Sequence, residues 1–319
     1  MVVIGCALVQ LTAHLRQNQN AIAVAPKSGR FVKFGTENIF IQETGPANGE
    51  AVFFIHGTGS WSELWRPTMD QLAVKGFYSV AIDLPPFGFS FNEVDAPLKY
   101  DRQSQANRII AVIKSLNIKK VTLVGHSFGG QATLTTAFLI PEMVNRLILV
   151  SIALGFGDQT DPFNPARAAG WVDALLNFAF FRNTLLGIGT APSLTKTFVD
   201  KFVANPATVT ESVTDIYKRP LVIDGKSEQI GDWLRDAVLS SDKDLVKKIE
   251  PYQMFTAPVN LIWGDLDKIT PLWQAEKLST MFKAVKMFSF PNVGHLPMIE
   301  EPKQFQDTVQ FILTQDQSP

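Results

Sequence analysis

Short, continuous apolar runs recur along this chain of 319 residues, and they constrain its fold more than any other feature. An apolar run of about four to eight residues is typical of a strand that is buried on both faces, as in a parallel sheet. Longer stretches between the runs, such as 102–116, are apolar on one side only. This alternation predicts an α/β fold, with a mostly parallel central sheet and helices on both faces. The expected strands are 39–42, 51–55, 78–82, 121–124, 147–150, 259–263 and 285–290.

The alternation stops between residues 154 and 252, where the pattern favours helices throughout. Asn205-Pro206 is a typical helix start, with asparagine at the N-cap and proline at the first helical position. A helical block between two strands predicts a helical cap insertion over one edge of the sheet. We therefore expect three parts, which are an N-terminal apolar segment and linker (1–30), a core (31–153 and 253–319) and a helical cap (154–252).

The composition excludes several classes of protein. Apolar residues make up 46% of the chain and charged residues 18%, so the chain can bury a large core. The formal net charge is −1, without a basic surplus, so we expect no nucleic-acid partner. Cys6 is the one cysteine, which rules out a disulfide within the chain, and the four histidines are scattered. We expect a small-molecule substrate and neither a metal nor an organic cofactor, while the oligomeric state stays open.

The N-terminus is apolar from residue 1 to about residue 13. A spanning helix needs roughly 18 or more apolar residues, and a signal peptide begins with basic residues, which are absent here. Two expectations stay open: a membrane-associated or truncated signal segment over residues 1–15, or a helix packed on the domain. The protein is accordingly expected to be cytoplasmic or associated with a membrane through this segment. Residues 17–30 are small and polar, as in a linker, so we expect a chain without residues 1–20 to fold.

The segment Gly125-His126-Ser127-Phe128-Gly129 follows the predicted strand 121–124 and precedes a helical run. This strand–turn–helix context is that of a nucleophile elbow, in which a serine is presented above the sheet. The two glycines remove side chains that would collide in so tight a turn. The helix N-terminus also favours developing negative charge. Ser127 is therefore the predicted nucleophile.

A serine hydroxyl needs a base, and the base needs a carboxylate that fixes its tautomer. His295 follows the last predicted strand and so lies at the same end of the sheet as Ser127. The loop after the strand 259–263 offers two carboxylates, Asp265 and Asp267. We favour Asp267 because it lies further into the loop, with Asp265 as the alternative. The chain order Ser…Asp…His is that of the strand–turn–helix serine enzymes.

A tetrahedral intermediate needs two preorganised N–H donors. One expected donor is the backbone N–H of Phe128, next to the nucleophile. The second should come from the loop His56-Gly57-Thr58 after the strand 51–55, and we expect it to be Thr58. These residues would form an oxyanion hole.

These motifs, in this chain order, resemble the α/β-hydrolase superfamily, in its capped branch of carboxylesterases, meta-cleavage-product hydrolases and cofactor-free perhydrolases. The resemblance covers about residues 31–313. It implies the α/β-hydrolase fold with a helical cap, and it places the acid at Asp267 and the second donor at Thr58. The segment from Asp83 to Ser90 resembles a further family motif, with Pro86 where a glycine is usual. That departure affects a turn near the pocket.

A serine at the elbow favours acyl transfer, since relatives that displace alkyl groups use aspartate there. The leading expectation is a serine hydrolase that cleaves a small to medium, mainly apolar carboxylic ester through an acyl-enzyme. One alternative is a carbon–carbon bond hydrolase of meta-cleavage-product type, for which Arg182 and Arg219 are available to hold a carboxylate. A third is a ligand receptor on the hydrolase fold. The aromatic stretch 178–181 is apolar on every side, so we expect part of it to be covered either by a bound substrate, in an apolar acyl pocket, or by a membrane or partner surface.

Overall fold

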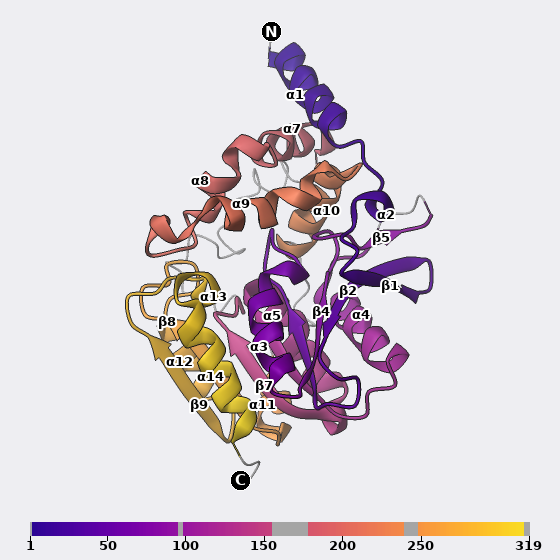
Figure 1. The fold of residues 1–319 in the computed structure, drawn as a ribbon. Coiled ribbons are helices and arrows are strands. Elements are labelled where there is room, and N and C mark those ends of the chain that lie inside the picture. Colours follow the sequence, from indigo (N-terminus) through magenta and orange to yellow (C-terminus); the bar gives the residue numbers. More distant parts are fainter. Residues whose placement is uncertain (1, 95–97, 155–177, 239–247, 316–319) are drawn as a thin grey trace.

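The computed structural model describes residues 2–94, 98–154, 178–238 and 248–315. Their nine strands form one sheet in the order β1-β2-β4-β3-β6-β7-β8-β9, with β5 paired to β2 (Figure 1). Neighbouring strands are parallel along the row β4, β3, β6, β7, β8 and β9. They are antiparallel at the end of the sheet that holds β1, β2 and β5. The strands are β1 (Gly29–Phe34), β2 (Glu37–Thr44), β3 (Ala51–Ile55), β4 (Tyr78–Ile82), β5 (Phe91–Asn92), β6 (Val121–His126), β7 (Val144–Val150), β8 (Val259–Gly264) and β9 (Val285–Phe290).

Helices cover both faces of this sheet, as the alternation predicts. Alternate residues of β3 show why: Val52 and Phe54 join one apolar cluster, whereas Phe53 and Ile55 join another on the opposite face. The first face packs against α3 (Arg66–Val74) and α14 (Pro302–Thr314). The second packs against α4 (Arg102–Ser115), α5 (Ser127–Leu139), α11 (Glu250–Met254) and α12 (Trp273–Ser279). Every predicted strand therefore occurs, and β1 and β5 are additions that the apolar runs did not indicate.

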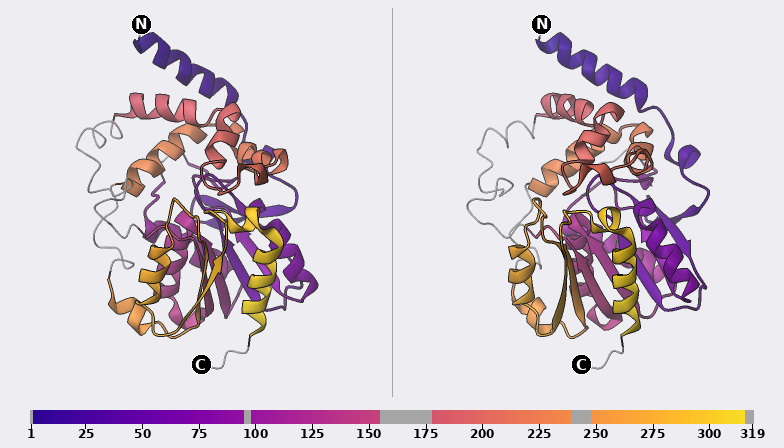
Figure 2. Two further views of the ribbon diagram at one scale, coloured as in Figure 1. Left: turned by 90° about the vertical axis from the view of Figure 1, so that its left-hand side faces the viewer. Right: turned by 60° about the vertical axis from the view of Figure 1, so that its left-hand side comes forward.

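Four helices, here called the cap helices, lie together over one end of the sheet (Figures 1 and 2). They are α7 (Ala179–Gly189), α8 (Thr195–Val199), α9 (Glu211–Lys218) and α10 (Lys226–Val238). The expected helix start at Asn205-Pro206 is a single turn, Pro206–Thr208, and the Asn205 side chain accepts from the N–H of Ala207. The parts 155–177 and 239–247 of the predicted cap lie outside the described residues.

The N-terminal segment is a helix, α1 (Val2–Arg16), that packs against the cap helix α7. Nε2 of Gln10 donates to the carbonyl of Phe180 and to Oγ1 of Thr184, both at 2.8 Å. A guanidinium N–H of Arg16 donates to Oγ1 of Thr190 at 2.9 Å. The two helices are in close contact at Gly187 of α7, where an added Cβ would lie 3.2 Å from the Val9 side chain of α1. Of the two expectations for this segment, a helix packed on the protein describes its position.

The expectation of an apolar N-terminal membrane segment is wrong. In the part of the chain that the structure describes, no helix is both long enough and apolar enough to cross a membrane. The 15 residues of α1 fall short of the span that a bilayer requires.

The segment expected to be a linker is also attached to the cap. Gln17 is buried, and its side chain donates to Oγ of Ser227 at 2.7 Å. The N–H of Gln19 donates to the carbonyl of Val222 at 3.1 Å, and α2 (Ala21–Val24) follows directly. A polar composition does not reveal these contacts, because the partners lie about 200 residues further along the chain.

We predict that deletion of residues 1–20 destabilises the protein, contrary to the expectation of a free linker. The deletion removes the hydrogen bonds of Gln10, Arg16 and Gln17, so at about 1 kcal/mol each the free energy of unfolding should fall by roughly 2–3 kcal/mol. Urea unfolding measures this change. Deletion of residues 1–5 is the control, since it removes none of these bonds. Equal unfolding free energies for the two truncated proteins would show that α1 contributes nothing to stability.

Candidate active site

Ser127 lies at the tight turn between β6 and α5. It is the first residue of α5, and its φ of 50° falls in the left-handed region that residues other than glycine seldom adopt. Two glycines make this turn possible. A Cβ on Gly125 would lie 2.2 Å from Oγ1 of Thr133, and a Cβ on Gly129 would lie 2.1 Å from the carbonyl oxygen of His56. The turn therefore places the Ser127 hydroxyl at the carboxyl end of the parallel strands.

His295 and Asp267 meet Ser127 at this end of the sheet. Oγ of Ser127 lies 2.8 Å from Nε2 of His295, and Nδ1 of His295 lies 2.8 Å from Oδ2 of Asp267. His295 is 1% exposed and Asp267 is 4% exposed, so water does not compete for these bonds. The parallel sheet explains the meeting, because the loops after β6, β8 and β9 leave it at one edge. This arrangement lets a hydroxyl pass its proton to an imidazole that a carboxylate orients.

Asp267 rather than Asp265 is the carboxylate at His295. Asp265 is exposed at the start of the same loop. Oδ1 of Asp267 accepts the backbone N–H groups of Ile269 and Thr270, each at 2.8 Å, and Oδ2 accepts the hydroxyl of Thr270 at 2.8 Å. Burial favours a higher pKa for Asp267, but His295 and these hydrogen bonds outweigh it and hold the pKa below its usual value. Asp267 therefore carries its charge at neutral pH.

Two further histidines, His56 and His126, are buried near His295. Burial lowers the pKa of His56 to about 4, and burial together with the neighbouring His295 lowers the pKa of His126 to about 3. Both rings are therefore neutral near pH 7. Nε2 of His126 donates to the carbonyl of His295 at 2.9 Å, and Nε2 of His56 accepts the N–H of Leu84 at 2.9 Å. These two side chains support the backbone, whereas His295 faces the serine.

The two expected oxyanion donors lie next to Ser127, Phe128 in the first turn of α5 and Thr58 on the loop after β3. Phe128 is the second residue of α5, so its N–H has no acceptor within the helix. Thr58 is half-buried in the loop after β3, and β3 pairs with β6 so that Ile55 lies opposite Gly125. The loop after β3 is in close contact with the turn at Ser127, since a Cβ on Gly57 would lie 3.0 Å from Cβ of Ser127. The structure thus brings the Thr58 loop and Phe128 to the serine.

Aromatic side chains of α10 and of the segment after α8 lie beside Phe128 and His295. The ring of Trp233, from α10, lies 5.0 Å from the rings of both Phe128 and Phe87. Phe202, which follows α8, lies 5.8 Å from the His295 ring. Ser127 itself is 7% exposed. The surroundings of the serine are therefore apolar and aromatic.

The loop that carries Phe87 is held by a buried lysine of the cap. Nζ of Lys226 donates to the carbonyls of Pro86 and Gly88, at 2.8 and 3.0 Å. Asp83, at the start of the loop, accepts the backbone N–H groups of Ser62 and Phe89. Burial lowers the pKa of Lys226 to about 8 and raises the pKa of Asp83 to about 6, and the attraction between the two charges opposes both shifts. Pro86, the departure from the family motif, is thus a point where the cap attaches to the core.

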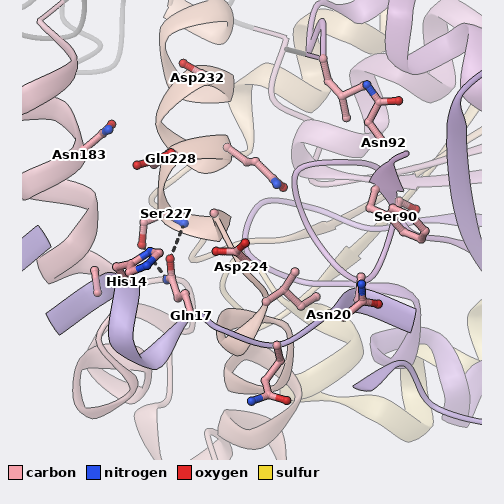
Figure 3. A pocket seen from close by; sticks show the side chains of 18 of the residues that line it. His14, Gln17, Asn20, Ser90, Asn92, Asn183, Asp224, Ser227, Glu228 and Asp232 are labelled. Atoms are coloured by element: carbon pink, nitrogen blue, oxygen red, sulfur yellow. Dashed lines mark hydrogen bonds between the residues drawn. The ribbon is translucent and has the colours of Figure 1, made fainter. Parts of the chain in front are cut away.

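A cavity of about 770 Å³ lies elsewhere, between α1, α10 and residues 90–94. Figure 3 shows polar side chains on its walls, among them His14, Gln17, Asn92 and Glu228. Ser127, Asp267 and His295 are not among its lining residues. The cavity is therefore distinct from the site around Ser127.

In the described ranges, no three His, Cys, Asp or Glu side chains are grouped as metal ligands would be.

Sequence reasoning did not assign Thr270, His126 or Phe202 to this site. Thr270 has a signal in its spacing, three residues after Asp267, which suits a hydroxyl that folds back onto a carboxylate. His126 has a signal in its position, since it directly precedes Ser127 in the chain. Phe202 has none, because its proximity to His295 depends on how the cap folds over the sheet.

Comparisons with known proteins identify the family of the chain. The model of the alpha/beta hydrolase fold family matches residues 50–302. An uncharacterized hydrolase of Bacillus subtilis, YugF, is 26% identical over 83% of this chain and 90% of its own length. The 2-hydroxymuconate semialdehyde hydrolase of Pseudomonas sp. strain CF600 is 28% identical over 91% of this chain and 95% of its own length.

Solved structures are similar over most of the chain as well. The esterase EaEST from Exiguobacterium antarcticum superposes with a TM-score of 0.71 at 23% identity, and the match covers 90% of this chain and 100% of that one. At this identity the likeness shows the fold alone. The predicted α/β-hydrolase fold is confirmed.

Proposed function

Since this chain is a hydrolase that belongs to the alpha/beta hydrolase fold family, we propose that it is a serine hydrolase of small to medium, mainly apolar carboxylic esters. The observation that carries the proposal is the unbroken row of hydrogen bonds from Ser127 through His295 to Asp267, each 2.8 Å long. Ser127 is the nucleophile, His295 the general base and Asp267 the acid that orients it.

Each step of the reaction has a group in place. His295 takes the proton of Ser127 as Oγ attacks the ester carbonyl, and the negative charge on the carbonyl oxygen is stabilised by the N–H groups of Phe128 and Thr58. The imidazolium then protonates the leaving alcohol, and an acyl-enzyme remains. A water that loses its proton to His295 attacks this ester, which releases the carboxylic acid and restores Ser127.

The aromatic surroundings support an apolar acyl group. Phe87, Phe128 and Trp233 pack against one another, and Phe128 is the residue next to the nucleophile. Each methylene that such a surface buries is worth about 0.8 kcal/mol. A charged acyl group would lose its hydration there without gaining a partner. The aromatic stretch 178–181 of the sequence, by contrast, places Phe178 and Phe181 on the exposed surface of the cap. We therefore propose Phe87, Phe128 and Trp233, rather than the stretch 178–181, as the wall of the acyl pocket.

We predict that kcat/KM on p-nitrophenyl esters rises from acetate to hexanoate, by several-fold for each added pair of carbons. Trp233→Ala should flatten this rise, since it removes the wall that the longer chains contact. Trp273→Ala is the matched control, because Trp273 lies on α12 and is 38% exposed. Efficiency that declines steadily from acetate onwards would rule out the apolar acyl pocket.

A second candidate is hydrolysis of a carbon–carbon bond in a meta-cleavage product, and one relative of the chain, from Pseudomonas sp. strain CF600, is a 2-hydroxymuconate semialdehyde hydrolase. Such a substrate carries a carboxylate that a cation would hold. Arg182 is ion-paired with Asp232 at 2.7 Å, and Arg219 stacks over the rings of Trp61 and Phe89 at 5.8 Å. Both cations are thus engaged within the protein, which favours the ester.

A panel of acyl esters, amides and one meta-cleavage product tests these alternatives together. We expect faster turnover of the acyl esters than of the amides or the meta-cleavage product. Turnover of the meta-cleavage product alone would favour the second candidate. A complete lack of turnover, with the fold intact, would favour a ligand receptor on this fold.

A further inference from the structure

Glu300 binds two separate segments of the chain with one carboxylate. It ends the short helix α13 (Pro297–Glu300) and is 8% exposed. Oε1 accepts the backbone N–H of Gly294 at 2.8 Å. Oε2 accepts the N–H groups of Ala204 and Asn205, at 2.7 and 3.2 Å. Gly294 directly precedes His295, whereas Ala204 and Asn205 belong to the cap, so the carboxylate joins the loop of the base to the cap.

The cap also contacts His295 directly at this place. The backbone N–H of His295 donates to the carbonyl of Phe202 at 2.8 Å, and the two rings lie 5.8 Å apart. The segments are too close for a side chain between them, since a Cβ on Gly294 would lie 2.6 Å from the backbone nitrogen of Ala204. The position of His295 therefore depends on contacts from the cap as well as from the sheet.

We infer that Glu300 is a positioning residue, which makes the orientation of His295 toward Ser127 depend on the seating of cap residues 202–205. This inference rests on the proposed function, in which His295 is the base. The cap then has a second role besides covering substrate, because displacement of 202–205 would free the backbone of His295 and weaken the base.

A carboxylate suits this position and an amide does not. Both oxygens of Glu300 accept hydrogen bonds from N–H groups, and bonds to a charged acceptor are stronger than neutral ones. In Glu300→Gln, one of the oxygens becomes an NH₂ group that faces an N–H donor. Either orientation of the amide therefore breaks the link on one side, to the loop of His295 or to the cap.

The test compares Glu300→Gln with Glu301→Gln in the full-length protein. Glu301 is the next residue and is exposed, so it controls for the loss of one negative charge. We expect Glu300→Gln to lower kcat on p-nitrophenyl butyrate by about 10- to 100-fold, because a small misplacement of a catalytic group can cost about 10²-fold. KM should change by less than about twofold, since the acyl pocket is untouched. Glu301→Gln should leave both constants close to wild type.

A second measurement reports on His295 without any substrate. The proton on Nδ1 of His295 is held by Asp267, so it should give a separate low-field proton resonance. We expect this resonance to shift or broaden in Glu300→Gln and to stay in place in Glu301→Gln. If Glu300→Gln does not fold, Glu300→Asp takes its place. Its shorter side chain keeps the charge but reaches the two segments less well, so we expect a loss of kcat smaller than about 10- to 100-fold and the same change in the spectrum.

The outcomes separate the two ideas. An inactive wild-type protein would refute the proposed function, while the resonance would still decide the role of Glu300. An unchanged resonance in the Glu300 variant would overturn the inference. So would a rise of KM at constant kcat, because Glu300 would then act on substrate binding and not on the base.

Discussion

Ser127→Ala is expected to reduce ester hydrolysis by about 10⁶-fold, the scale found when the nucleophile of a serine protease is removed. The reason is that no acyl-enzyme can form, and only the binding of the substrate and the oxyanion donors would remain. The fold should persist, because among the residues that the structure describes Oγ of Ser127 forms a single hydrogen bond, to His295. Initial rates on p-nitrophenyl butyrate measure the loss, with circular dichroism as the check on folding.

Ser151→Ala is the matched control for this variant. Ser151 is also a buried serine with a positive φ, of 44°, and it follows β7 at the same end of the sheet. Its activity should stay near wild type. If Ser127→Ala retained activity while Ser151→Ala lost it, the nucleophile would be misassigned.

Asp267→Asn is the second large effect that we expect. An amide in place of Oδ2 would offer N–H to Nδ1 of His295 and so favour the tautomer in which Nε2 carries the proton and cannot accept one from Ser127. In a serine protease the same change lowers kcat by about 10⁴-fold, and a similar loss is expected here.

Asp265→Asn should change kcat little, since Asp265 is exposed two residues away. Measured kcat values for the two variants, on one ester at one pH, rank the two carboxylates. A larger loss in Asp265→Asn than in Asp267→Asn would contradict the geometry of this loop.

The sheet and the three central side chains could be predicted from sequence because both follow from local pattern. Buried strands are short apolar runs, and parallel strands bring their carboxyl ends to one edge, so Ser127 and His295 had to lie near one another. The choice between Asp267 and Asp265 does not follow from this pattern. It depends on the turn that Thr270 closes onto Asp267, which apolar periodicity does not report.

The contacts of the cap and of the N-terminus could not be predicted, because they depend on distant partners. Gln17 looked like part of a linker, yet Ser227 buries it. Lys226 carries no sequence signal of burial, yet two carbonyls of the loop after β4 hold its ammonium group inside the protein. The sequence around Glu300 does not indicate its role either. The N–H groups that donate to its two oxygens come from loops nearly 100 residues apart. Such polar contacts leave no periodic pattern in the sequence.

The measurement that tests the central claim most directly is covalent labelling of the wild-type protein with a fluorophosphonate, followed by mass spectrometry of the digested chain. This reagent reacts with a serine whose proton a base can remove. We expect one phosphonyl group per chain, located on Ser127, and no labelling of Ser127→Ala. A label on a different serine, or an unlabelled protein that still hydrolyses esters, would contradict it.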